Sequence, residues 1–169
     1  MQVRACTLAD LPAVQAVYAH HVLHGAGTFE EVPPTVEEMT ARWRQITAGG
    51  RFPFLVAEAD GQVVGFAYAS EFRARAAYRY TCESSVYIAP EAQRRGVGHA
   101  LMHEVIALCT ARGLREMLAV IGDSQNYASI GLHGALGFAH VGTFHNVGYK
   151  FGRWLDVVLM QRKLSSDQL

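Results

Sequence analysis

Hydrophobic and polar positions change their spacing repeatedly along the chain, and these changes predict alternating strands and helices. Short apolar or alternating runs predict strands at residues 2–6, 54–59, 63–69, 83–89, 115–121, 138–143 and 154–161. Helical spacing predicts helices that begin near Leu11 and after Thr35, and others over residues 97–112 and 126–136. The resulting order, β-α-α-β-β-β-α-β-α-β-β, predicts one α/β (α+β) domain. Its sheet is expected to be largely antiparallel, with one parallel crossover around the 97–112 helix.

Capping and turn residues fix several of these boundaries. Thr35 precedes Glu38 by three positions, which is the spacing of a capping box at a helix start. Asp60 and Gly61 form a two-residue hairpin signal between two apolar runs. Repeats, low-complexity tracts and interdomain linkers are absent from the sequence. The chain is therefore expected to fold as a single unit.

Composition excludes several classes of protein. Half of the 169 residues are hydrophobic, and 15 Lys+Arg balance 15 Asp+Glu, which argues against a dedicated nucleic-acid-binding protein. No apolar run reaches 18 residues, so no membrane span is expected, and the first residues lack the apolar core of a signal peptide. Three dispersed cysteines indicate reduced thiols in a cytoplasmic protein. Neither these cysteines nor the eight histidines form a metal-binding motif.

A glycine-spaced turn follows the 83–89 strand and opens the next helix. Its sequence is Gln93-Arg94-Arg95-Gly96-Val97-Gly98-His99. Gly96 and Gly98 allow close approach of the backbone and positive φ angles, so successive N–H groups can point outward at the positive end of the helix dipole. Arg94 and Arg95 add fixed positive charge. The turn therefore indicates a pyrophosphate site, and the alternative is a glycine-rich turn with solvated arginines.

The spacing also narrows the identity of the ligand. A P-loop would end in Gly-Lys-Ser/Thr, which does not occur here. A dinucleotide fingerprint would need a third glycine where Leu101 stands. The pattern Gln/Arg-x-x-Gly-x-Gly/Ala instead resembles the acetyl-CoA loop of the GNAT acetyltransferase superfamily.

Longer segments resemble one subfamily of GNAT enzymes, the phosphinothricin N-acetyltransferases. The segments are TFEEVPPTVEEM, ARAAYRYTCESSVYIAPEAQRRGVG, AVIGDSQNYASIGLHGALGFAHVG and YKFGRWLDVVLMQR. This subfamily acetylates small amino-acid analogues such as phosphinothricin, methionine sulfoximine and methionine sulfone. The resemblance covers residues 3–164 and implies a single N-acetyltransferase domain there, followed by a tail at 165–169.

The resemblance implies a GNAT fold and assigns its acetyl-CoA residues. The sheet would be mixed and mostly antiparallel, with helices on both faces and a splayed central strand pair that receives the pantetheine arm. Backbone groups that bind this arm would come from Val86, Tyr87 and Ile88. The residues that hold the pyrophosphate would be Arg94, Arg95, Gly96, Val97, Gly98 and His99. Asn126 would bind the cofactor near the arm, while its position also fits a helix N-cap.

Two residues are candidates for proton transfer. Glu83 begins the cofactor strand, and it matches the catalytic glutamate of the subfamily, which implies a general base for the incoming amine. The alternative is a surface carboxylate. His133 stands where many GNAT enzymes carry a tyrosine that protonates the departing thiolate. It is equally compatible with a packed helix residue.

Substrate residues are expected on two segments. Phe29 and Glu30 lie on a proline-stiffened loop that can form a wall of the amine pocket. Arg73, Arg75 and Tyr78 lie just before Glu83, and an arginine fork suits the carboxylate of a free amino acid. A solvated basic connector is the alternative for this second segment. The resemblance also implies a homodimer, with residues 145–150 and Trp154 in the region of the pocket and the dimer contact.

The sequence thus predicts a cytoplasmic N-acetyltransferase that uses acetyl-CoA and acts on a small amino-acid-type amine. Transfer would be direct, within a ternary complex. Cys82 adjoins Glu83, but successive strand residues face opposite sides, so an acetyl-cysteine route is not expected. Alternatives are an acetyltransferase for protein N-termini, aminoglycosides or polyamines, and a non-catalytic acetyl-CoA-binding regulator.

Overall fold

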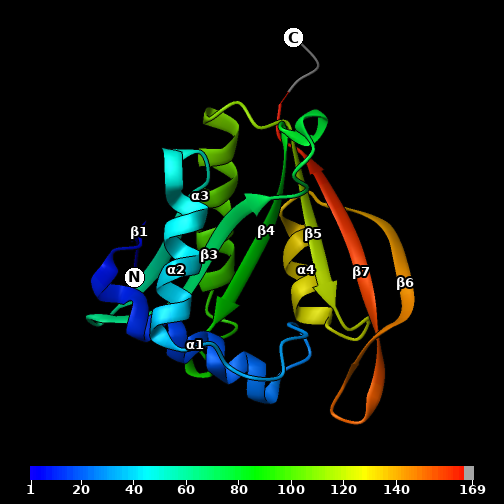
Figure 1. Cartoon of the computed structure of the whole chain (residues 1–169), viewed down its shortest axis with the longest axis horizontal. Helices are drawn as coiled ribbons and strands as arrows, with labels where there is room; N and C mark the ends of the chain where they lie inside the picture. Colours follow the sequence, from blue (N-terminus) through cyan, green and yellow to red (C-terminus); the bar gives the residue numbers. More distant parts are fainter. Residues whose placement is uncertain (166–169) are drawn as a thin grey trace.

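A computed structural model describes residues 1–165, in which seven strands form one mixed sheet (Figure 1). Its order is β1-β2-β3-β4-β5-β7-β6. The strands are β1 (Gln2–Ala5), β2 (Phe54–Ala59), β3 (Gln62–Glu71), β4 (Thr81–Ile88), β5 (Glu116–Gly122), β6 (Ala139–Lys150) and β7 (Arg153–Lys163). The helices are α1 (Leu11–His24), α2 (Val36–Thr47), α3 (Val97–Ala111) and α4 (Tyr127–Ala135). This order confirms the predicted fold class, while tail residues 166–169 lie outside the described part of the chain.

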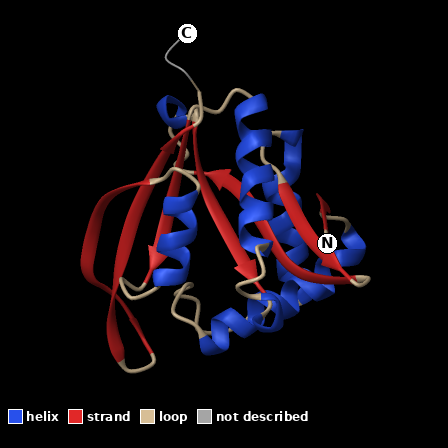
Figure 2. Cartoon of the chain, turned by 180° about the vertical axis from the view of Figure 1, so that it is seen from behind, coloured by secondary structure: helices blue, strands red, loops and turns tan. Residues whose placement is uncertain are grey.

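The helices cover both faces of the sheet. Helices α1 and α2 lie on one face, and α3 and α4 lie on the other (Figures 1 and 2). Along β4 the residues alternate between these faces, as the strand period requires. Cys82 is fully buried, and its thiol meets the thiol of Cys109 on α3. Glu83 lies opposite Ser70 of β3 and faces the α1–α2 side. None of the helices within residues 1–165 is long and apolar enough to cross a membrane.

The two central parallel strands separate halfway along their length. Strands β4 and β5 pair only from Thr81↔Glu116 to Ser84↔Ala119. Beyond that point, residues 85–88 remain paired with β3, and residues 120–122 remain paired with β7. The predicted splayed pair is therefore confirmed. The unpaired edge of β4 contains Val86, Tyr87 and Ile88.

Local signals placed most boundaries to within two residues. The capping box at Thr35 is present, with Glu38 N–H donating to Thr35 Oγ1 and Thr35 N–H donating to the Glu38 carboxylate. The predicted strand at 138–143 was wrong in length, because β6 continues to Lys150. A bulge interrupts it. Phe144 lies opposite Val157 and Gly148 lies opposite Leu155, so β6 advances four residues where β7 advances two. Asn146 adopts a φ of 54° there, so the alternation that marks a regular strand is lost.

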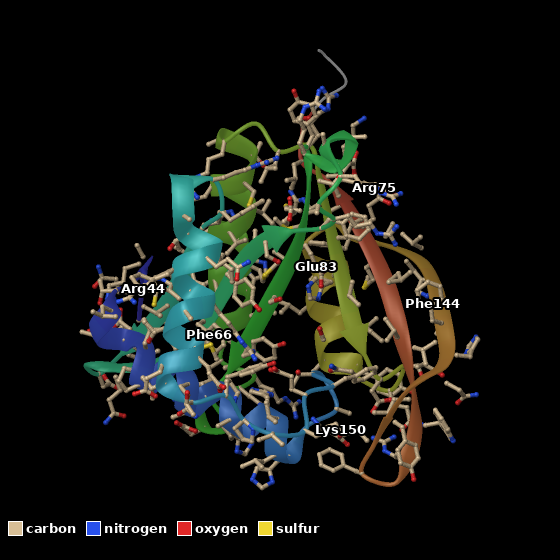
Figure 3. All side chains as sticks on the ribbon, in the orientation of Figure 1. Arg44, Phe66, Arg75, Glu83, Phe144 and Lys150 are labelled. Atoms are coloured by element: carbon tan, nitrogen blue, oxygen red, sulfur yellow. The ribbon has the colours of Figure 1, made fainter. Side chains whose placement is uncertain are left out.

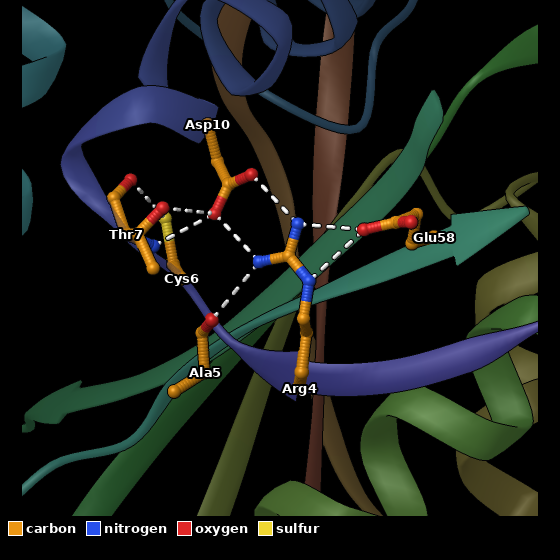
Figure 4. A network of polar contacts seen from close by, with 6 residues as sticks. All are labelled: Arg4, Ala5, Cys6, Thr7, Asp10 and Glu58. Carbon is orange, nitrogen blue, oxygen red and sulfur yellow. Dashed lines mark hydrogen bonds and ion pairs between the residues drawn. The ribbon is translucent and has the colours of Figure 1, made fainter. Parts of the chain in front are cut away.

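A polar cluster far from the splay ties the first strand to the fold. Arg4 donates to both oxygens of Asp10 at 2.8 Å and to Glu58 at 2.8 Å (Figure 4). Asp10 also accepts hydrogen bonds from Thr7. The Arg4 guanidinium holds the pKa of Asp10 well below its ordinary value. The stabilisation from Asp10 is therefore present above the unfolded-state carboxyl pKa and is lost in strong acid.

Candidate active site

The glycine turn forms an anion-binding concavity at the start of α3. Arg94 and Gly96 have positive φ angles of 60° and 81°, and Gly96 is the N-cap residue. The first helical hydrogen bond runs from Ala100 N–H to Gly96 O, so the N–H groups of residues 97–99 precede it and have no helical acceptor. The first turn contains no acidic residue. These donors, the helix dipole and the neighbouring arginines suit a pyrophosphate.

Gly98 has a different role from the one its spacing suggested. The expectation of a positive φ is wrong, because Gly98 lies inside α3 with helical geometry, whereas Gly96 does adopt it. Gly98 is buried, and a Cβ atom there would lie 3.1 Å from Leu132 Cδ2 and 3.8 Å from Ile88 Cγ1. The absence of a side chain therefore lets α3 pack closely against α4 and β4.

The free edge of β4 is organised by a histidine that the sequence did not single out. His21 Nε2 lies 2.8 Å from the carbonyl oxygen of Ile88, so the ring nitrogen must carry the donated hydrogen. Burial lowers the pKa of His21, which favours this neutral ring. The side chain of Tyr87 packs against His21 and Tyr18, which fixes this part of β4 against α1. The only sequence signal for His21 was its place in the helical His20-His21 pair.

Asn126 lies at the opposite side of the splay, after the end of β5. Its Oδ1 accepts the Ser129 N–H at 3.2 Å, which confirms the N-cap alternative for α4. Its Nδ2 donates to the carbonyl of Gly122 at 3.4 Å. Asn126 therefore ties the start of α4 to the end of β5, and its cofactor contact stays a prediction.

Glu83 is a half-buried carboxylate on the β4 strand just before the splay (Figure 3). Burial raises its pKa above the ordinary value of 4.5. Within the described residues its carboxylate has no hydrogen-bond or ion-pair partner. Its negative charge adds to burial in raising the pKa of Tyr68 on the neighbouring strand. A partly desolvated carboxylate without a cation beside it is suited to accept a proton.

His133 is a buried residue of α4. It is 3% exposed, its Nδ1 lies 2.8 Å from Ser129 O, and its ring packs edge-on against Phe138 at 4.9 Å. Burial lowers its pKa, which favours the neutral ring. The packed-residue alternative therefore describes its surroundings, and a role as general acid stays a prediction.

The loop after α1 carries Phe29 and Glu30, and each is held by the protein itself. Glu30 forms a two-pronged ion pair with Arg42 of α2 at 2.5 and 2.9 Å and also accepts a hydrogen bond from Tyr18. Arg42 lowers the pKa of Glu30. The ring of Phe29 lies over Gly122 and Gly148 at the ends of the splay and of β6. Phe29 therefore lies against the ends of β5 and β6, and its role as a wall of the amine pocket stays a prediction, while the Glu30 carboxylate is engaged with protein groups.

The basic connector before β4 contains the predicted substrate residues Arg73, Arg75 and Tyr78, and two of these, Arg73 and Tyr78, lie in contact. The Arg73 guanidinium stacks on the rings of Phe72 and Tyr78 at 5.1 and 5.6 Å. Arg75 is exposed and starts a short 3₁₀ turn, Ala76–Tyr78. Figure 3 shows Arg75 near the connector end of the sheet, above Glu83 in that view. The side chain of Arg75 has no partner within residues 1–165, which leaves its fork available.

A cavity of about 490 Å³ lies between α2 and strands β2 and β3 on the Glu83 side of the sheet. Tyr18, Tyr68 and Ser70 line it, and Ser70 is the cross-strand neighbour of Glu83. The sequence did not predict this cavity, because its walls come from segments far apart in the chain. Across residues 1–165 no group of three potential ligands is placed to hold a metal ion.

The splayed strands and the anion-binding turn together define an acetyl-CoA-dependent acetyltransferase. Residues 3–159 match the Acetyltransferase (GNAT) domain family, and the chain belongs to this family. It is 52% identical to the phosphinothricin N-acetyltransferase of Alcaligenes faecalis over 167 residues, covering 96% of this chain and 84% of the relative. It is 38% identical to the L-methionine sulfoximine/L-methionine sulfone acetyltransferase of Salmonella typhimurium, covering 97% and 95%.

Solved structures agree with this assignment. A GNAT phosphinothricin acetyltransferase from Sinorhizobium meliloti, solved in complex with acetyl-CoA, superposes with a TM-score of 0.93 at 45% identity. The match covers 96% of this chain and 87% of the solved one. The chain is therefore an N-acetyltransferase that takes its acetyl group from acetyl-CoA.

Proposed function

We propose that the enzyme acetylates the α-amine of a small amino-acid analogue of the phosphinothricin, methionine sulfoximine or methionine sulfone type. The observation that carries this proposal is the half-buried, partnerless Glu83 carboxylate beside the free edge of β4. The names of the relatives support the substrate class. The arginine-bearing connector before β4 suits an acceptor that carries its own carboxylate.

Each group on the chain then has a chemical task. Acetyl-CoA supplies the thioester that the amine attacks; the C–S bond breaks, and CoA leaves as a thiolate that takes up a proton. Glu83 accepts the proton that an α-ammonium group must lose, directly or through a water molecule. A backbone N–H of residues 86–88 stabilises the negative charge that develops on the acetyl oxygen. Cys82 points to the opposite face of β4, toward Cys109, which supports direct transfer and disfavours an acetyl-cysteine route.

A panel of amines, assayed by release of free CoA, tests this proposal. We expect turnover with methionine sulfoximine, methionine sulfone and phosphinothricin, and little with polyamines, aminoglycosides or peptides with free N-termini. Preferred turnover of cationic amines would favour the rival substrate classes. Tight acetyl-CoA binding without turnover of any amine would favour a regulator.

Arg75 is the proposed anchor for the carboxylate of the substrate. A charge-assisted hydrogen bond contributes about 1.5–3 kcal/mol, so Arg75→Ala should raise the KM for the amino acid roughly 10–150-fold. The KM for acetyl-CoA should stay nearly constant, because the connector lies away from the α3 turn. Steady-state kinetics with each substrate varied in turn measures both values.

A substrate analogue provides the control for Arg75. With the carboxylate replaced by an amide, wild type should be slow and Arg75→Ala should cause little further change. Arg73→Ala is the matched variant for comparison. Arg73 lies in the same connector, but its guanidinium is stacked on Tyr78, whereas that of Arg75 has no partner within residues 1–165. Equal losses for acid and amide analogues would mean that Arg75 shapes the pocket and does not bind the carboxylate.

The enzyme is further proposed to be a homodimer. Apolar side chains at least half exposed gather on the last two strands and their connecting turn: Val141, Phe144, Val147, Tyr149, Phe151 and Trp154. An exposed apolar surface of this kind is typical of a protein interface. Trp154 is 64% exposed, so Trp154→Asp should leave the fold intact and shift the protein to a monomer. Sedimentation equilibrium measures this shift, and a monomeric wild type would contradict the proposal.

We also assign the activity to the cytoplasm. The thiols of Cys6, Cys82 and Cys109 are buried and unbridged. Burial raises the pKa of Cys6 to about 12, which keeps it protonated. Protonated, buried thiols support a protein that functions in a reducing compartment.

A further inference from the structure

Two residues of β6, Gly148 and Lys150, face the loop that carries Phe29. Both are buried, whereas Val147 and Tyr149 beside them are more than half exposed. We propose that Gly148 and Lys150 are positioning residues that fix Phe29 and thereby set the amine side of the active site. This inference rests on the proposed function, in which Phe29 is a wall of the amine pocket.

Lys150 holds the loop at two points just before Phe29. Its Nζ donates to the carbonyl of Gly25 at 2.7 Å and to the carbonyl of Thr28 at 2.8 Å. The side chain is 2% exposed, and a buried ammonium group is tolerated only when it is well hydrogen bonded. These bonds join segments more than 120 residues apart in the chain. Figure 3 shows Lys150 at the end of β6 beside this loop.

Gly148 provides the space that the ring of Phe29 occupies. A Cβ atom on Gly148 would lie 2.6 Å from Phe29 Cδ2 and 2.8 Å from Phe29 Cζ. On the other side of the ring, a Cβ atom on Gly122 would lie 2.9 Å from Phe29 Cε1. The ring therefore rests directly on two backbone surfaces, and a single methyl group would displace it.

The two helices hold the loop on the side away from β6. Thr28 Oγ1 lies 2.9 Å from the hydroxyl of Tyr18 on α1, and Glu30 is paired with Arg42 on α2. The bulge at residues 145–147 sets the direction of β6 just before Gly148. The position of Phe29 is thus determined by β6 on one side and by α1 and α2 on the other.

The test compares three single variants of the full chain. Gly148→Ala displaces the Phe29 ring, and Lys150→Met removes the ties to the loop while it keeps the length of the side chain. Each should raise the KM for the amine roughly 10-fold or more, because a displaced pocket wall weakens binding of the amine itself. The KM for acetyl-CoA should change less than about twofold. Gly142→Ala is the matched control on the same strand, since a Cβ atom there meets nothing within 4 Å.

A double variant separates positioning from general damage. In a Phe29→Ala background the ring is gone, so adding Gly148→Ala should change the KM for the amine little. Hydrogen–deuterium exchange of residues 25–30 gives a readout that does not need turnover. Exchange should rise in Lys150→Met and stay at the wild-type level in Gly142→Ala. If Lys150→Met does not fold, Gly148→Ala and the double variant decide the matter.

The possible failures are distinguishable. If Phe29→Ala leaves the KM for the amine unchanged, the proposed role of Phe29 fails, and the positioning role fails with it. If Phe29→Ala raises that KM but Gly148→Ala and Lys150→Met do not, the proposed function stands and the positioning inference is overturned. Parallel rises in both KM values, or additive effects in the double variant, would also overturn it.

Discussion

Replacing Glu83 with glutamine should lower turnover by roughly 10²–10⁴ while the affinity for acetyl-CoA stays nearly constant. This corresponds to about 3–5 kcal/mol of activation free energy. Glutamine keeps the shape of the side chain but cannot accept a proton from the substrate ammonium. The variant should regain rate as the pH rises, because free amine then forms without help from the enzyme. A wild-type rate with an unchanged pH profile would contradict the assignment of the base.

The stability of this variant supplies its control. Burial raises the folded-state pKa of Glu83 above its ordinary value of 4.5. A carboxyl group of this kind stabilises the fold while protonated, and this contribution is lost as the pH rises through the folded-state pKa. Glu83→Gln should therefore be at least as stable as wild type at neutral pH in thermal unfolding. A lower Tm would mean that the lost activity reflects damage to the fold.

The second large effect is expected at the anion-binding turn. Gly96→Val should raise the Kd for acetyl-CoA roughly 100-fold or more, because losing two charge-assisted hydrogen bonds costs about 1.5–3 kcal/mol each. A β-branched residue does not readily adopt the φ of 81° that orients these donors. A Cβ atom at Gly96 meets nothing within 4 Å, so the core should not be disturbed. Isothermal titration calorimetry measures the affinity.

The opposite end of α3 offers a matched control for Gly96. Gly113 has a φ of 80° and also has open space around a Cβ atom. Gly113→Val should therefore cause a similar backbone strain and a similar fall in Tm, with an unchanged affinity for acetyl-CoA. Equal losses of affinity in both variants would remove the α3 turn from the binding site.

Local sequence signals were enough to predict most elements of the fold. The capping box at Thr35 and the turn at Asp60-Gly61 depend on neighbours within four residues, and the structure contains both. The β6 strand was predicted too short because its bulge breaks the alternation at Asn146. Asp156 on β7 accepts the Asn146 N–H at 2.9 Å, and this hydrogen bond holds the bulge of β6 against β7. The hydrophobic pattern of residues 138–150 does not include Asp156, so that pattern alone could not predict the continued strand.

Site residues could be predicted where they are close together in the sequence, and they were missed where they depend on tertiary contacts. The turn at residues 93–99 could be identified because its glycines, arginines and helix start are contiguous. His21 and Arg42 were missed, since their partners, Ile88 O and Glu30, lie 67 and 12 residues away. Lys150 left two weak signals: it is one of two lysines in a chain with 13 arginines, and it ends the 145–150 segment that the resemblance places near the pocket.

The scarcity of lysine limits the acylation of the enzyme's own side chains by its thioester substrate, acetyl-CoA. A thioester can acylate a neutral primary amine without any catalyst, whereas a guanidinium group stays protonated and is a poor nucleophile. Nearly all cationic side chains of the protein are guanidinium groups. Lys150 contacts the loop that carries Phe29, and its nitrogen is buried with two backbone carbonyls as acceptors. The amine of the acceptor therefore meets little competition from lysine side chains of the enzyme itself.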